Sequence, residues 1–196
     1  LWGVSPRDLL TSFDGCAIAF PHEYTKRGYF KGNNWLHLDQ SPTRNDLEML
    51  QGWLTAFDVN DGDASLTYLE GSHKLHGEAA AKFNLKEKKD WYKLTPEVIQ
   101  WYKAKGCLQK KIINCKAGSL VLWDSRIVHA GVEASRHRAK PNFRFVIYTC
   151  FAPRSMASAK DLEKKQKAYR EGRLTSHWPA NRIRLFPKLP RTYDKP

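Results

Sequence analysis

Short runs of β-branched and aromatic residues, separated by turn signals, constrain the fold of this chain more than any other feature of its sequence. Turn signals rich in Gly, Asn, Asp and Ser occupy 60–63, 70–72 and 116–118. Runs bounded in this way are typical of β-strands, which we expect at 16–20, 35–38, 51–59, 65–69, 111–115, 119–123 and 142–151. Many short strands predict an antiparallel sandwich or a small barrel.

Two segments carry helix signals. Thr95 is a suitable N-cap, Pro96 suits the first helical position, and Gly106 would follow the end of this helix. A second helix is expected at about 158–171, where Gly172 would end it. Both helices are short enough to pack against a β core rather than to form a bundle.

The chain is expected to form one domain, because 196 residues suit a single core. We expect this core at 1–153, with a Lys-rich, partly helical insertion at about 77–110. A basic C-terminal helix and an extended tail would follow at 154–196 and pack on the core. Within the tail, Trp178 and Phe186 are expected to provide the contacts, and the tail is expected to close one side of the functional site or to dock only for stability.

Composition places limits on the function. The four cysteines form no Cys-x-x-Cys pair, so the sequence gives no support to a zinc finger. Free thiols in a reducing compartment are the simplest interpretation. We therefore expect an intracellular, cytoplasmic protein. The formal charge is +13, and 154–196 contains 12 Lys and Arg against 4 Asp and Glu, a balance of +8. Such a surface suits nucleic acid, an anionic membrane or an acidic substrate, although a solvated surface is the preferred interpretation.

A candidate metal site begins at His37 and Asp39. Residues two apart on an extended strand share a face, so this imidazole and this carboxylate can converge on one ion. A single His-x-Asp is also consistent with a polar strand end. His129, in the segment that follows the strand at 119–123, would complete two histidines and one carboxylate, a set that binds Fe(II) and leaves coordination positions open.

Arg144 opens the last core strand. Arg144, Val146 and Tyr148 share one face of this strand, and a charged group among apolar neighbours needs an anionic partner. A five-carbon dicarboxylate would supply that partner through a bidentate salt bridge, and an internal Asp or Glu is the alternative.

These pieces together resemble the phytanoyl-CoA dioxygenase (PhyH) superfamily of Fe(II)- and 2-oxoglutarate-dependent oxygenases. The resemblance covers roughly 15–151 and rests on the order of the pieces, which are His37-Leu38-Asp39, Trp53 in its strand, an acidic turn, Leu69-Glu70-Gly71-Ser72-His73, Gly118 to Asp124, His129 and Arg144. Two positions depart from the family pattern. Glu70 replaces a usual Pro, and Gly131 replaces a hydroxyl residue that helps bind the cosubstrate in some members, a role that Tyr148 could take over here.

The resemblance implies a mainly β fold, the double-stranded β-helix (jelly roll, cupin-like), with a few flanking helices. It implies iron ligands at His37, Asp39 and His129, with Arg144, Trp53 and Tyr148 at the cosubstrate. The implied cofactors are Fe(II), 2-oxoglutarate and O₂, with ascorbate as a helpful reductant. The implied reaction is hydroxylation of an organic substrate with release of succinate and CO₂, and the intact Asp39 favours hydroxylation over halogenation.

Two other functions stay open at this point. The first is a non-catalytic metal- or ligand-binding protein of the same fold, and the second is a protein that binds or modifies nucleic acid through its basic surface. We rank nucleic acid below a small-molecule or protein-side-chain substrate and expect no membrane partner. The sequence leaves the substrate and the oligomeric state open.

Overall fold

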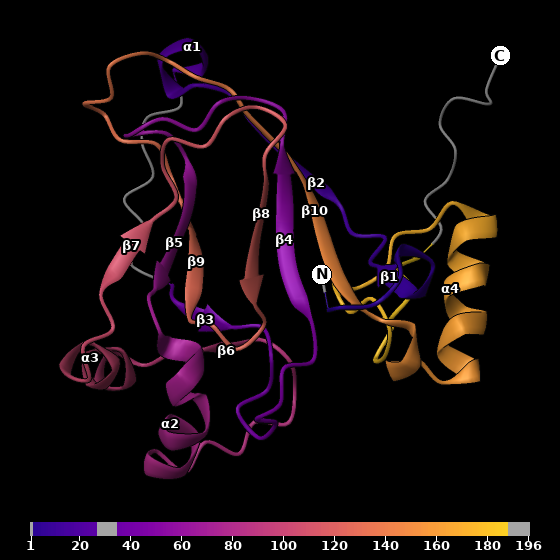
Figure 1. The fold of residues 1–196 in the computed structure, drawn as a ribbon. Helices are drawn as coiled ribbons and strands as arrows, with labels where there is room; N and C mark the ends of the chain where they lie inside the picture. The colour runs from indigo at the N-terminus through magenta and orange to yellow at the C-terminus, as the bar shows by residue number, and fades with distance from the viewer. Residues whose placement is uncertain (1, 27–34, 188–196) are drawn as a thin grey trace, which may run out of the picture.

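The computed structural model describes residues 2–26 and 35–187, and it is built from two five-stranded antiparallel sheets (Figure 1). Sheet A contains β1 (Leu9–Thr11), β2 (Cys16–Ala19), β4 (Leu50–Thr55), β8 (Leu120–Asp124) and β10 (Arg144–Pro153). Sheet B contains β3 (His37–Leu38), β5 (Ser65–Leu69), β6 (Tyr92–Lys93), β7 (Gln109–Lys111) and β9 (His129–Val132). The described helices are α1 (His22–Thr25), α2 (His76–Lys82), α3 (Pro96–Ala104) and α4 (Ala159–Glu171). The predicted mainly β, double-stranded β-helix fold is confirmed.

Sheet A is organised around β10, which pairs with β4 along one edge and with β1 and β2 along the other, while β8 pairs with β4. The two-residue period of a strand separates its faces: Val146 is fully buried, whereas Ile147 is 47% exposed. Gly52 lets β8 and β10 approach β4 closely, because a Cβ at this position would lie 2.5 Å from the carbonyl oxygen of Val121. Close pairing of β4 with both neighbours therefore requires glycine at this position.

Sheet B has β9 between β3 and β5, with β6 and β7 at its edges. Leu38 and Ala130, the neighbours of His37 and His129 along their strands, point to the outer face and are buried in one apolar cluster with Val98 of α3. Helices α2 and α3 therefore cover sheet B on the side opposite the histidines. Their positions beside sheet B in Figure 1 are consistent with this packing. This packing fixes the strands that hold the candidate metal ligands.

The predicted helices agree well with the structure. Thr95 caps α3 by accepting a hydrogen bond from the backbone N–H of Val98, and Pro96 opens the helix. Ser158 caps α4 in the same way, and Gly172 ends it with a left-handed backbone at φ 60°. The insertion predicted at 77–110 contains α2 and α3, but it also contains β6, which belongs to sheet B.

The predicted strands agree less completely. The strand expected at 111–115 lies at Gln109–Lys111, and Cys115 instead makes an isolated bridge with Val59. Strand bounds at 65–69 match, while β1, β6 and β9 were not predicted. These three strands have only two to four residues, and the sequence His-Ala-Gly-Val of β9 carries little β propensity of its own. Pairing with neighbouring strands, rather than local sequence, makes them strands.

The C-terminal segment is not the extended tail that we expected over its described part. The chain turns back on itself, with an antiparallel bridge between Thr175 and Leu185 and a hydrogen bond from the N–H of Phe186 to the carbonyl of Leu174. Trp178 is buried, as expected, beside Met49 in a small apolar cluster, but Phe186 remains 46% exposed. Ala180 and Ile183 of the same loop are also buried, so several side chains dock it.

Candidate metal centre and cavity

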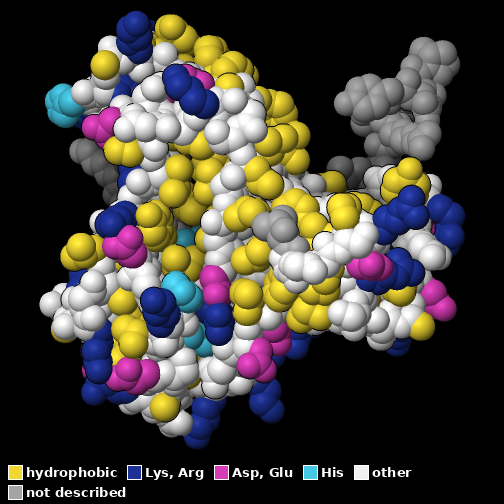
Figure 2. Space-filling view, in the orientation of Figure 1, with side chains coloured by type: hydrophobic (Ala, Val, Ile, Leu, Met, Phe, Trp, Pro, Cys, Tyr) yellow, Lys and Arg dark blue, Asp and Glu magenta, His cyan; other side chains and the backbone are white. Residues whose placement is uncertain are grey.

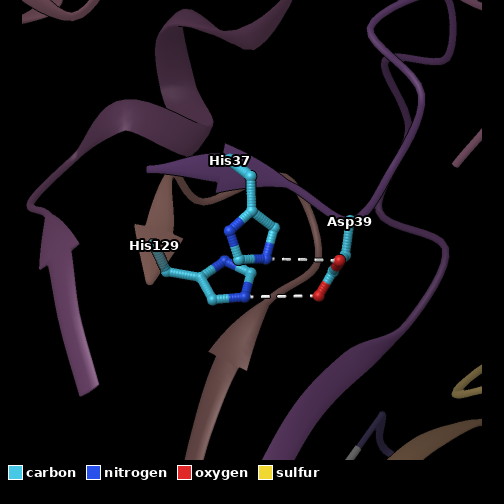
Figure 3. Close-up of side chains that lie close together, drawn as sticks. All are labelled: His37, Asp39 and His129. Carbon is cyan, nitrogen blue, oxygen red and sulfur yellow. Dashed lines mark ion pairs between the residues drawn. The ribbon is translucent and has the colours of Figure 1, made fainter. Parts of the chain in front are cut away.

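His37, Asp39 and His129 converge at the inner face of sheet B (Figure 3). His37 of β3 lies directly opposite His129 of β9 in the strand register, and Asp39 immediately follows β3. The Nε2 atoms of His37 and His129 lie 3.5 and 3.2 Å from the two carboxylate oxygens of Asp39. One ligand atom from each of the three residues lies within 4.8 Å of the others.

Backbone carbonyls fix the orientation of both imidazoles. The Nδ1 of His37 lies 3.1 Å from the carbonyl oxygen of Trp35, and the Nδ1 of His129 lies 3.0 Å from that of Ile127. A carbonyl can only accept, so each Nδ1 donates its proton to the backbone and each Nε2 is turned toward Asp39. Trp35 also stacks on His37 at 4.7 Å between ring centroids and donates its indole N–H to the carbonyl of Gly131.

Asp39 is positioned by a chain of two hydrogen bonds from sheet A. The side-chain amide of Gln51 donates to Asp39 Oδ2 at 2.7 Å, and the indole N–H of Trp123 donates to the amide oxygen of Gln51 at 3.0 Å. Burial alone would raise the pKa of Asp39, but its contacts with His129 and then His37 outweigh burial and hold the pKa well below its usual value. The carboxylate therefore stays ionised.

The donor set fits a divalent first-row metal ion. With both Nε2 atoms deprotonated, two imidazole lone pairs and a carboxylate converge on one point, where a cation would offset their mutual repulsion. Two histidines and one carboxylate on one side of an ion form the arrangement that suits Fe(II) and leaves positions open for other ligands. The hydrogen bonds from Nδ1 to carbonyls and from Gln51 to Asp39 are of the kind that supports metal ligands in proteins.

The three residues line a cavity of about 840 Å³ between the two sheets. The other predicted site residues, Trp53, Arg144 and Tyr148, also line this cavity, from sheet A. Figure 2 shows histidine and acidic side chains where this space reaches the surface between the sheets. The structure therefore brings all six predicted site residues to one cavity.

Arg144 is half-buried in the cavity wall, and its guanidinium carbon lies 6.0 Å from the centroid of the Trp53 ring. Among residues 2–26 and 35–187 no carboxylate lies within ion-pair distance of Arg144, so the internal ion pair that we considered is not formed there. The guanidinium thus remains available for an anion in the cavity.

Gln51, Asp14 and His177 are among the cavity-wall residues that were not identified from the sequence. Gln51 lies two residues before Trp53 on the same strand, so the period of the strand could have placed it on the inner face. Asp14 and His177 lie outside the strands, and no local periodicity points to them. Only the folded structure brings these two to the cavity.

The described part of the chain has no helix that is long and apolar enough to cross a membrane. All four cysteines, which are Cys16, Cys107, Cys115 and Cys150, are free thiols in the structure.

The fold and the site define a class, that of double-stranded β-helix proteins with two histidines and one carboxylate at an open metal position. Residues 28–138, more than half of the chain, match the family model of phytanoyl-CoA dioxygenase (PhyH). The chain therefore belongs to the phytanoyl-CoA dioxygenase family, whose enzymes use Fe(II) and 2-oxoglutarate with O₂.

A curated relative is the Ava biosynthesis cluster protein O of Aspergillus versicolor, which is 29% identical over 187 residues. The alignment covers 91% of this chain and 57% of the relative, so the chain spans little more than half of that protein's length.

Solved structures with detectable likeness include the non-haem α-ketoglutarate-dependent epimerase SnoN from nogalamycin biosynthesis, at 14% identity and a TM-score of 0.42, covering 75% of this chain and 48% of that one. Another is an N-substituted L-amino acid dioxygenase of Burkholderia ambifaria AMMD in complex with α-ketoglutarate, at 15% identity and a TM-score of 0.32, covering 72% and 47%.

Proposed function

We propose that this chain forms the catalytic core of an Fe(II)- and 2-oxoglutarate-dependent oxygenase that hydroxylates a small organic substrate with release of succinate and CO₂. One observation supports this proposal above the others. The candidate metal ligands on one side, and on the opposite sheet an arginine without a carboxylate partner among the described residues, face the same cavity. A protein that only bound a metal would not need the second feature.

Each predicted residue has a distinct part in this proposal. His37, Asp39 and His129 would hold Fe(II), and Gln51 would keep the carboxylate of Asp39 turned toward it. Arg144 would bind the distal carboxylate of 2-oxoglutarate through its planar fork of N–H donors.

Trp53 and Tyr148 would complete the cosubstrate pocket. Trp53 is 1% exposed and gives Arg144 an apolar floor. Tyr148, its partner in the strand register, would offer the hydroxyl that Gly131 does not provide. Bound iron and cosubstrate supply the activation of O₂, while the protein positions the groups and excludes water.

The substrate class is proposed from the cavity and the relative together. A volume of about 840 Å³ accommodates a small organic molecule beside the cosubstrate. The relative's name places it in a biosynthesis cluster, which favours a metabolite as the substrate. Free cysteines and the cellular source of 2-oxoglutarate favour an intracellular enzyme.

The test is succinate formation by the purified protein with Fe(II), ascorbate and 2-oxoglutarate across a panel of metabolites and peptides. A product that gains one oxygen atom is expected in parallel with succinate, and His129→Ala should remove both signals. Binding of iron and 2-oxoglutarate without succinate from any substrate, and without slow uncoupled turnover, would support the non-catalytic alternative instead.

A further inference from the structure

Asp14 and His177 stand beside the metal centre but have no part in it. Asp14 lies between β1 and β2, His177 follows α4, and both line the cavity that contains Asp39. Both lie outside residues 28–138, the part that matches the family model. They are therefore features of this chain beyond the matched core.

The two segments that carry these side chains are joined by reciprocal hydrogen bonds. The N–H of Phe13 donates to Thr175 Oγ1 at 3.1 Å, and the N–H of Thr175 donates to the carbonyl of Phe13 at 2.8 Å. Trp178, next to His177, is 3% exposed and anchors the loop in the apolar cluster with Met49. Asp14 and His177 are thus held in place by buried structure.

Neither side chain has the partners that its chemistry requires. Asp14 Oδ1 accepts the N–H of Gly15 at 2.7 Å, but no cation of the described chain lies within ion-pair distance of this carboxylate. His177 Nε2 is buried and has no hydrogen-bond partner among the described residues. Buried polar groups in native proteins are normally satisfied, and exceptions mark places where a ligand binds or a water lies.

Two other charged groups of the cavity wall are already assigned. Arg144 is reserved for the cosubstrate in the proposed function, and Glu133 pairs with His22 at 3.6 Å. Lys111 forms no ion pair within the described residues, and burial lowers its pKa. Asp14 differs from the other cavity carboxylates, because it belongs neither to the metal centre nor to an ion pair within the described residues.

We propose that Asp14 and His177 bind a protonated nitrogen of the substrate, an ammonium or a guanidinium. This inference rests on the proposed function, since it places the substrate beside the metal centre. A cationic group with several N–H donors would satisfy the carboxylate of Asp14 and the free imidazole nitrogen together. The uncharged part of the substrate would then extend along the cavity toward the iron.

The experiment uses the intact protein loaded with Co(II) and 2-oxoglutarate, whose binding is measured first. Benzylamine, phenylguanidine, benzyl alcohol and benzoate are then titrated, and quenching of the cavity tryptophans Trp35, Trp53 and Trp123 reports binding. We expect the better of the two cations to bind about tenfold more tightly than the alcohol. The comparison of benzylamine with phenylguanidine separates the two nitrogen groups.

Asp14→Asn should remove the preference for the cation, while Glu133→Gln, which changes another acidic residue of the same wall, should leave it. His177→Gln should reduce it. Thermal unfolding of each variant reports whether the fold is retained, and retained binding of Co(II) and 2-oxoglutarate reports whether the metal centre is intact.

Equal binding of amine and alcohol, tighter binding of benzoate, binding of none of the probes, or a preference that survives Asp14→Asn would each overturn the proposal while leaving the oxygenase function standing. Failure of Co(II) or 2-oxoglutarate to bind the wild-type protein would instead overturn the proposed function itself.

Discussion

The two sheets face the same cavity but differ on their outer sides. The outer face of sheet B is buried under α2 and α3, whereas the outer face of sheet A exposes a row of large apolar side chains, which are Ile18 at 60%, Leu54 at 39%, Leu120 at 43% and Ile147 at 47%. Figure 2 shows apolar side chains gathered around the strands of sheet A. Both sheets follow the same two-residue alternation, so covering elements, rather than strand sequence, make the difference.

This difference matches the tasks proposed for the two sheets. Two of the proposed metal ligands lie on sheet B, where small displacements decide coordination and the packing of α2 and α3 on the outer face restrains the strands. Sheet A carries Arg144, whose long side chain tolerates small movements of its strand. The predictions below test this division.

The largest effect is expected at the metal centre. His129→Ala removes one of the three proposed ligands, from the sheet whose outer face is covered by helices, so Fe(II) or Co(II) binding should be lost at micromolar metal. Isothermal titration under anaerobic conditions measures this loss, and His137→Ala, at an exposed histidine, is the matched control. Unchanged metal affinity in His129→Ala would remove His129 from the ligand set.

Arg144→Ala on sheet A should abolish tight 2-oxoglutarate binding while metal binding survives. Loss of one partner of a buried charged pair costs roughly 3–5 kcal/mol. Arg144→Lys should also bind the cosubstrate more weakly, because an ammonium lacks the planar fork. Titration of 2-oxoglutarate into Co(II)-loaded protein tests both variants, with Lys111→Ala as a control in the same cavity. If Arg144→Ala binds the cosubstrate as well as the wild type does, the anion lies elsewhere.

The outer faces should differ in their contribution to the free energy of unfolding. Leu69→Ala in the buried cluster of sheet B should cost about 2–5 kcal/mol, as expected for a core leucine. Leu54→Ala, at an exposed position on sheet A, should cost less than about 1 kcal/mol. Urea denaturation of the two variants gives both values. Equal losses would mean that the outer face of sheet A is covered in solution.

A smaller effect is expected at Gln51, which connects the two sheets through Asp39. Gln51→Leu removes the hydrogen bond to the carboxylate and should weaken Co(II) binding about 10- to 100-fold, as is typical for partners of metal ligands. Gln109→Leu, at a cavity-wall glutamine that instead bonds Thr67, should have little effect on metal affinity. Equal metal affinities in the two variants would make the Gln51 contact structural only.

The sequence predicted most of the features that depend on local signals. Caps and breakers placed α3 and α4, and residue type with family order selected six side chains that the fold brings to one cavity. Short strands such as β9 escaped prediction because their structure depends on neighbours far along the chain. The presence of Asp14 and His177 in the cavity wall was missed for the same reason, since the hydrogen bonds between Phe13 and Thr175 span most of the sequence.

The order of the strands along the chain also determines when each half of the site can form during synthesis. Every described strand of sheet B lies within 37–132, so His37, Asp39 and His129 leave the ribosome before Arg144 and well before His177. The 48 residues from His129 to His177 take about 2–10 s to add at typical rates of elongation. A nascent chain could therefore acquire its metal ligands several seconds before it has the wall that would hold a substrate against them.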